Sequence, residues 1–241
     1  MDDLKTNKPI GERPLGAYMP AGRPAATVAP VTFGGLWQEL KDVASRNRTL
    51  LAVGVGALVV ADVVLTTIAG ERTANLLGNV LSLIVIYLLM REMLRAENLI
   101  ENEGGFGSYF LASFLAGLGA IGGFLLLIVP GLYLLARWAV APALTIARHL
   151  PGVDALTQSW HLTRDVAWTL VGFYVAAFMA VLLMGFVAGF AGGVLDGGQG
   201  TVTLVLVSIV ANAFVALSAA LSIAIYRLIA GAADMVKGVF E

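Results

Sequence analysis

The stretch Leu125–Arg148, LLLIVPGLYLLARWAVAPALTIAR, is apolar enough to cross a bilayer but cannot form one uninterrupted helix. Pro130 lacks the N–H that a continuing helix needs and restricts the residue before it, and Pro142 interrupts the stretch a second time. We therefore expect one membrane span to end at Pro130-Gly131, a tight turn to follow, and the next span to begin there. Arg137 would then lie about 10 Å below this turn, at 1.5 Å per residue, inside the hydrocarbon.

The composition of the whole chain agrees with a membrane protein. Of its 241 residues, 59% are hydrophobic and only 13% are charged, against about a quarter in soluble domains. The net charge of −1 argues against a nucleic-acid partner, which would need a strongly basic surface. The absence of cysteine excludes disulfides, thiolate metal sites and cysteine nucleophiles. We expect an all-α, polytopic membrane protein without a cofactor.

Six hydrophobic segments within residues 49–241 have about the 20 residues that a helix needs to cross a membrane. They are Thr49–Ile68, Ala74–Met90, Ser108–Val129, Gly131–Ala147, Val166–Leu195 and Thr201–Ala230. Thirteen of the fifteen Lys and Arg residues fall on one side of these spans, while Arg72 falls on the other and Arg137 within a span. This bias predicts that both termini lie in the cytoplasm. The location that we expect, a bacterial inner membrane, is implied by the resemblance described below.

Three segments outside the spans have a distinct composition. Residues 1–30 hold five of the eight prolines and are expected to form a disordered cytoplasmic tail, which could also dock a protein partner. Residues 31–48 and 151–165 show apolar residues at helical spacing, so each predicts an amphipathic helix at the membrane interface, with a short soluble helix as the alternative for the first. Trp37, Trp160, Arg148 and Arg164 are the side chains expected at headgroup level.

Two charged residues lie within the predicted spans and could meet. Asp62 is about 20 Å along the first span from its cytoplasmic end, which in a core of about 30 Å is the depth expected for Arg137. Because intramembrane charges usually face the bundle interior and find each other, we predict an Asp62–Arg137 ion pair between the first and fourth spans. The alternative is that each charge reaches water separately.

The remaining polar residues of the spans are uncharged and are expected mainly to bond across helices, with Asn212 kept as a candidate cavity residue. The acidic link of Glu92, Glu97, Glu101 and Glu103 lacks the spacing of a calcium loop, so we expect a solvated helix there. Ser159, His149 and His161 could in principle form a hydrolytic group with nearby carboxylates, but no motif for such a site is present. We expect no enzyme and no metal site.

One region resembles a known family. Val129-Pro130-Gly131-Leu132-Tyr133, Arg137 and Ala141-Pro142-Ala143, followed by Asp154-Ala155-Leu156 and Ser159-Trp160-His161-Leu162-Thr163, are similar to the membrane domain beside the catalytic domain of some bacterial glycerophosphoryl diester phosphodiesterases, and to its stand-alone six-span relatives. The resemblance covers about forty residues and implies a membrane domain. It does not imply hydrolysis, which in that family belongs to a separate soluble barrel for which this chain has no room. The family often bears an acidic residue where this chain has Ala147-Arg148-His149.

These observations favour an accessory or scaffolding membrane protein that associates with membrane lipids and has no catalytic activity of its own. The alternative is a small transporter or lipid-translocating protein with a cavity between spans 1, 4 and 6. A polar cavity containing Asp62, Arg137 and Asn212 would favour the alternative, and a dry, tightly packed interior would favour the scaffold.

Overall fold

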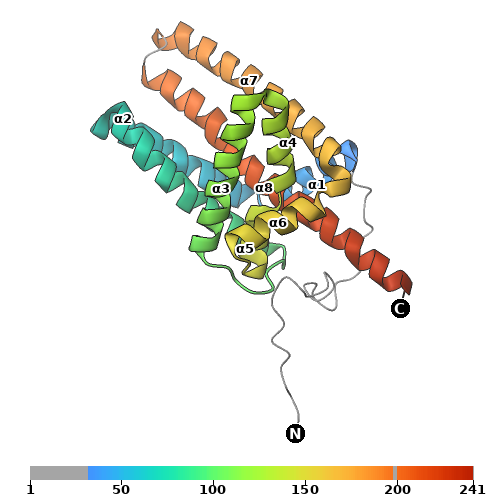
Figure 1. The fold of residues 1–241 in the computed structure, drawn as a ribbon. Coiled ribbons are helices and arrows are strands. Elements are labelled where there is room, and N and C mark those ends of the chain that lie inside the picture. Colours follow the sequence, from blue (N-terminus) through green and yellow to red (C-terminus); the bar gives the residue numbers. More distant parts are fainter. Residues whose placement is uncertain (1–31, 198–199, 241) are drawn as a thin grey trace.

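The computed structural model describes residues 32–197 and 200–240, and the side chains of all of these except 70–72, 74–75 and 230–240. The expected tail over 1–30 therefore lies outside the described residues. The described part is helical and contains no strand (Figure 1). Its helices are α1 (Phe33–Arg46), α2 (Arg48–Ala96), α3 (Phe106–Leu126), α4 (Ile128–Trp138), α5 (Ala141–Arg148), α6 (Gly152–Leu162), α7 (Ala167–Asp196) and α8 (Thr201–Phe240).

The prediction of an all-α protein with six spans is confirmed. Six segments of the described chain are long and apolar enough to cross a membrane. Their bounds are Arg48–Ala69, Leu76–Ala96, Phe106–Leu126, Ile128–Arg148, Arg164–Asp196 and Thr201–Ile229. Each one overlaps the corresponding predicted segment, because a continuous apolar run of about 20 residues has few other stable structures.

The first two spans both belong to α2, which turns back on itself. A side chain at Gly54 would contact Leu89, and one at Gly78 would contact Asp62, so the two halves of α2 lie antiparallel. The cyan and teal halves of α2 accordingly lie close together in Figure 1. We refer to residues 48–69 as the outgoing arm and to 76–96 as the return arm. The hairpin leaves Asp62 facing the return arm.

The predicted interruptions of the Leu125–Arg148 stretch occur, but the first is shifted along the chain. The turn lies at Leu127, whose backbone is extended between α3 and α4, and Pro130 lies in the first turn of α4, where its missing N–H costs nothing. A methyl group at Gly123 would come within 2.7 Å of the Gly131 Cα, so the two helices approach through glycines. Pro142 lies in the first turn of α5, after a second interruption at Ala139-Val140.

The buried core lies at the end of the bundle where α1, α5 and α6 meet the end of the return arm and the second half of α8. Almost every residue of α5 is buried, and in Figure 1 the short helices α5 and α6 lie below the α3–α4 hairpin. The far halves of α2, α7 and α8 expose large apolar side chains instead, as expected for surfaces that contact lipid tails. We refer to the core-bearing end as the closed end.

Both predicted amphipathic segments are helical. In α1, Leu36, Leu40 and Val43 pack against α8, while Trp37 keeps 51% of its surface exposed. In α6 the buried residues include Ala155, Leu156 and Ser159, whereas Val153 is exposed. Gly152 packs directly on the α3 backbone at Ala112. Whether either helix lies at a membrane interface stays a prediction.

Candidate functional site: an acidic pocket within the bundle

Asp62, on the outgoing arm of α2, is held by two polar side chains of α8. The Ser208 hydroxyl donates a hydrogen bond to Asp62 Oδ2 at 2.5 Å, and Asn212 Nδ2 donates a second to the same oxygen at 2.7 Å. Asn212 Nδ2 also lies 3.0 Å from Ser208 Oγ. Ser208 and Asn212 are four residues apart on one helix, so they share a face and reach the same carboxylate.

A pocket of about 390 Å³ opens beside this carboxylate. The two arms of α2 and helix α8 form its walls. Its polar lining is Asp62, Thr66, Asn79, Ser82, Ser208 and Asn212, and aliphatic residues of α8 complete it. Asp62 is only partly buried and faces this space. The pocket therefore has a mixed lining of one carboxylate, several neutral oxygens and hydrocarbon, within segments that are apolar enough to cross a membrane.

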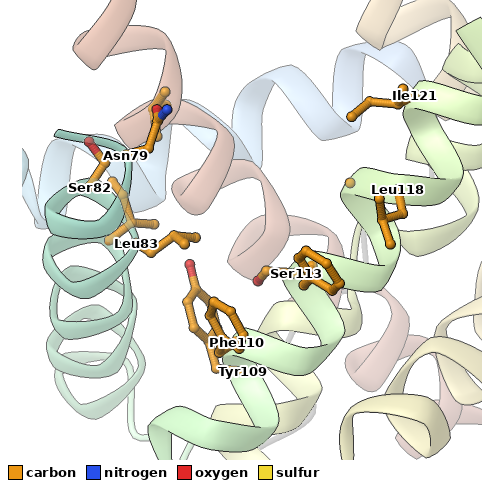
Figure 2. Close-up of a pocket in the computed structure, with 12 residues that line it drawn as sticks. Asn79, Ser82, Leu83, Tyr109, Phe110, Ser113, Leu118 and Ile121 are labelled. Carbon is orange, nitrogen blue, oxygen red and sulfur yellow. The ribbon is translucent and has the colours of Figure 1, made fainter. Parts of the chain in front are cut away.

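A second pocket, of about 550 Å³, adjoins the first (Figure 2). It lies between the return arm of α2 and α3, and it shares Asn79, Ser82 and Val215 with the Asp62 pocket. In Figure 2, Asn79, Ser82 and Leu83 on the return arm lie across from Tyr109 and Ser113 on α3. Apart from these polar groups the lining is apolar. We refer to this space as the α2–α3 pocket.

The predicted Asp62–Arg137 ion pair is wrong. Asp62 is bound to α8, whereas Arg137 packs against Trp160, with its guanidinium carbon 4.3 Å from the ring centroid. No ion pair of Asp62 occurs among the residues that the structure describes. Similar depth along two helices does not determine which helices are neighbours, and α4 packs mainly against α3 and α7.

Arg137 is 3% exposed, and its Nε and Nη1 atoms have no hydrogen-bond partner within the described residues. The Tyr133 ring adjoins Trp160, with a centroid-to-centroid distance of 6.0 Å, and its centroid lies 5.9 Å from the guanidinium carbon. The aromatic faces of Trp160 and Tyr133 therefore replace the expected carboxylate, through cation–π attraction that is strongest when the cation is desolvated. Arg137 lines neither of the two pockets described above.

The interruption between α4 and α5 is completed by hydroxyl groups of α6. The Ser159 hydroxyl donates to the Arg137 carbonyl oxygen at 2.8 Å and accepts from the Val140 N–H at 3.3 Å. The Thr163 hydroxyl, which has one proton to donate, lies 3.1 Å from the same carbonyl and 2.8 Å from the Ser159 carbonyl. Unpaired backbone groups are costly within a membrane, so a broken helix needs such partners. The Ser159 hydroxyl is therefore used by the Arg137 and Val140 backbone groups and does not bond to either histidine.

Of the side chains expected at headgroup level, Arg148 is buried instead. It is 7% exposed, its Nε donates to the Tyr226 hydroxyl at 3.0 Å, and it forms an ion pair with Glu101 at 3.3 Å. Arg164, in a short 3-10 turn before α7, is exposed. Trp160 is partly buried against Arg137, as described above.

The acidic link is not simply solvated. Each of its four glutamates contacts an arginine, and Glu97 is the most buried, with its side chain 8% exposed between Arg46 at 2.9 Å and Arg227 at 2.6 Å. The other pairs are Glu92 with Arg95, Glu101 with Arg148, and Glu103 with Arg91 and Arg95. The prediction that this link holds no calcium loop stays untested, although no group of three possible metal-ligating side chains occurs in the described part.

Sequence reasoning identified Asp62 and Asn212 but not the surface that they share. Thr66 lies one helical turn after Asp62, and this spacing could have identified it from the sequence. No sequence pattern indicated Tyr109 and Ser113, because their position opposite the return arm depends on where α3 packs.

Comparison with known proteins adds no relative to these observations. No family model matches the chain, and no curated protein or solved structure matches it.

Proposed function

We propose that this protein is a small transporter whose solute site is the Asp62 pocket. The observation that carries the proposal is a partly buried carboxylate on a segment that is apolar enough to cross a membrane, beside a pocket of about 390 Å³, with no cationic partner among the described residues. Ionisable groups at such depth are costly and usually belong to a substrate or ion pathway. The pocket lies within the size range of small-molecule sites, roughly 300–1,000 Å³.

The sequence favoured a scaffold and left a transporter as the alternative. The proposal adopts the transporter and assigns it a different cavity. The polar pocket includes Asp62 and Asn212, as that alternative required, yet its walls are spans 1, 2 and 6 and Arg137 lies elsewhere. Location in a bacterial inner membrane is part of the proposal and rests on the family resemblance, while the cytoplasmic position of both termini rests on the distribution of Lys and Arg. The absence of catalytic activity is also proposed, and it rests on the lack of a recognisable catalytic motif.

The resemblance to the membrane domain of glycerophosphoryl diester phosphodiesterases remains compatible with this role. Membrane lipids are proposed as the surroundings of the bundle, and a protein partner could bind the N-terminal tail. The residues that carry the resemblance contribute the α3–α4 turn, the α4–α5 interruption and α6. None of these residues lines the Asp62 pocket.

Water access to the pocket tests the proposal directly, because the chain contains no cysteine of its own. We would introduce Asn79→Cys and Ser82→Cys in the pocket, with Val80→Cys and Leu81→Cys as matched controls on exposed apolar positions of the same helix. A charged methanethiosulfonate reagent reacts with a thiolate in water and not with a thiol in lipid. We would measure the modification rate in vesicles of both orientations.

A transporter predicts that the two pocket variants react at least tenfold faster than the controls, and from both membrane faces. Reaction from one face only would contradict transport. Equal, slow reaction of all four variants would contradict a hydrated pocket and support the accessory, scaffolding role instead.

A further inference from the structure

We propose that the Asp62 pocket and the α2–α3 pocket together bind an amphipathic monocation, a compound with one ammonium group on a hydrocarbon chain. The inference rests on the proposed function, because it takes the Asp62 pocket as the solute site. Asp62 pairs with the ammonium group, and the α2–α3 pocket takes the chain.

The charge of the ligand follows from the charged side chains around it. Asp62 is the single ionisable acid or base of either lining other than the Tyr109 phenol, within the described residues. One carboxylate neutralises one positive charge, and any remaining charge would be buried uncompensated in a medium where this is costly. A ligand with a net charge of +1 is therefore favoured over a neutral, anionic or divalent one.

The remaining donor atoms argue against a metal ion as the main ligand. Ca²⁺ and Mg²⁺ prefer several carboxylate oxygens, and transition metals prefer imidazole or thiolate. The Asp62 pocket offers one carboxylate with neutral hydroxyl and amide groups, and no group of three possible metal-ligating side chains occurs in the described part. Its volume of about 390 Å³ is also that of an organic molecule.

The second pocket supplies the place for a hydrocarbon chain. The Asn79 and Ser82 side chains lie where the two pockets join, and the α2–α3 pocket beyond them is lined by the polar Tyr109 and Ser113 and by Leu83, Ile86, Phe110, Phe114, Leu118 and Ile121 (Figure 2). The last four of these are 43–59% exposed, so the pocket is a groove that is open on one side. A ligand bound across the junction would place its charged end beside Asp62 and lay its hydrocarbon chain along this apolar wall.

The same residues disfavour a phospholipid headgroup. Phosphatidylethanolamine carries an ammonium group, but also a phosphate that would need a cationic or strongly donating partner nearby. Neither lining contains lysine, arginine or histidine. The site therefore selects an amine without an attached anionic group.

Ligand binding to the purified protein in dodecyl maltoside tests the inference. We would measure dissociation constants, from the shift of the unfolding temperature, for ethylammonium, butylammonium and octylammonium, with 1-octanol as the uncharged control. We expect octylammonium to bind most tightly, since each buried methylene gains roughly fourfold in affinity. We expect no saturable shift with 1-octanol. Asp62→Asn should weaken octylammonium binding by at least tenfold.

A pair of glycine variants separates the chain pocket from general partitioning. Gly117→Leu should fill the α2–α3 pocket, because Gly117 lines it and has open space at its Cβ position. Gly122→Leu, on the same helix with equally open space and outside both linings, is the matched control. Gly117→Leu should weaken octylammonium binding at least tenfold while leaving ethylammonium binding within twofold, and Gly122→Leu should change neither.

Each of the following results would overturn the inference. One is octylammonium binding that is unchanged in both Asp62→Asn and Gly117→Leu. Another is ethylammonium binding as tightly as octylammonium. The third is phosphatidylethanolamine binding that matches octylammonium and depends on Asp62. If the thiol variants show a hydrated pocket but none of the amines binds, the inference fails and the proposed function stands. If the thiols do not react, both fail.

Discussion

At the scale of single residues, backbone groups that lack a helical partner are hydrogen-bonded by side chains from segments distant in the sequence. The Arg137 carbonyl and the Val140 N–H lose their helical partners where α4 ends, and Ser159 of α6 serves both. Ser159 and Thr163 are fully buried, so water cannot replace them. A hydroxyl on an amphipathic helix thereby fixes how the most buried span is interrupted.

We expect Ser159→Ala to lower the free energy of unfolding by about 1–3 kcal/mol, the cost of leaving a buried polar backbone group unpaired. The Thr163 hydroxyl stays within hydrogen-bond distance of the Arg137 carbonyl, whereas the Val140 N–H loses the side-chain acceptor that Ser159 provides. Thermal unfolding in detergent measures the change. Thr157→Ala is the control on the same helix, because the Thr157 hydroxyl is exposed and bonds only within α6. Equal effects of the two substitutions would contradict the assigned role.

At the scale of elements, the bundle is built from hairpins whose helices approach at specific small residues. Gly123 meets Gly131 in the α3–α4 hairpin, and Gly192 meets Thr203 in the α7–α8 hairpin. The α7–α8 turn is also held by Asp196, whose carboxylate accepts from the Thr203 backbone N–H at 2.9 Å and from its hydroxyl at 2.5 Å. Close backbone approach through small residues is the usual basis of helix pairing in lipid.

The adjacent glycines of α3 test whether this approach is specific. A methyl group at Gly123 would lie 2.7 Å from the Gly131 Cα, whereas one at Gly122 meets nothing within 4 Å. We expect Gly123→Ala to destabilise the protein by about 1–3 kcal/mol through overpacking. Gly122→Ala should be neutral or stabilising by up to about 1 kcal/mol, through helix propensity. Unfolding in detergent measures both, and an equal response would show that the helices do not meet at Gly123.

At the scale of the whole molecule, ion pairs join segments at the closed end. Glu97, after the return arm, contacts Arg46 of α1 and Arg227 of α8, and Glu39 of α1 also contacts Arg227, at 3.2 Å. The parallel bridge between Asn102 and Arg148 brings the α2–α3 link against the end of α5. This end is therefore tied together by charge, while the pockets lie among segments that are linked mainly by apolar packing.

The charges of the closed end predict a response to acid. Hydrogen bonds from Arg91 and then Arg95 lower the pKa of Glu103 below its usual 4.5. A carboxylate whose pKa is lowered by folding stabilises the fold above about pH 4.5, and this contribution is lost as the pH falls through the lowered pKa. In Glu103→Gln, we expect a lower unfolding temperature at pH 7 and a weaker further fall between pH 5 and pH 3 than in the unmodified protein.

The comparison needs an acidic residue that lacks such a partner. Asp42 is exposed on α1 and forms no ion pair among the described residues. Asp42→Asn should therefore keep the acid dependence of the unmodified protein. A Glu103→Gln curve parallel to that of Asp42→Asn would contradict the contribution assigned to Glu103.

The sequence by itself determined the helical class, the six spans and the interruptions near Pro130 and Pro142. These features follow from local chemistry, because apolar length and missing N–H groups act within a few residues along the chain. It also identified Asp62, Arg137 and Asn212 as polar residues inside the spans. The exact turn at Leu127 was missed by three residues, since proline is as well accepted in the first turn of a helix as before it.

Only the tertiary structure decided which of these residues meet. Depth along a span can be counted, but neither the rotation of a helix nor its neighbours can be counted when apolar residues surround it on all sides. Lipid tails are as apolar as the side chains, so no hydrophobic gain selects one helix face over another. Small residues and a few hydrogen bonds make that choice, and here they direct Asp62 toward Ser208 and Asn212 and Arg137 toward Trp160.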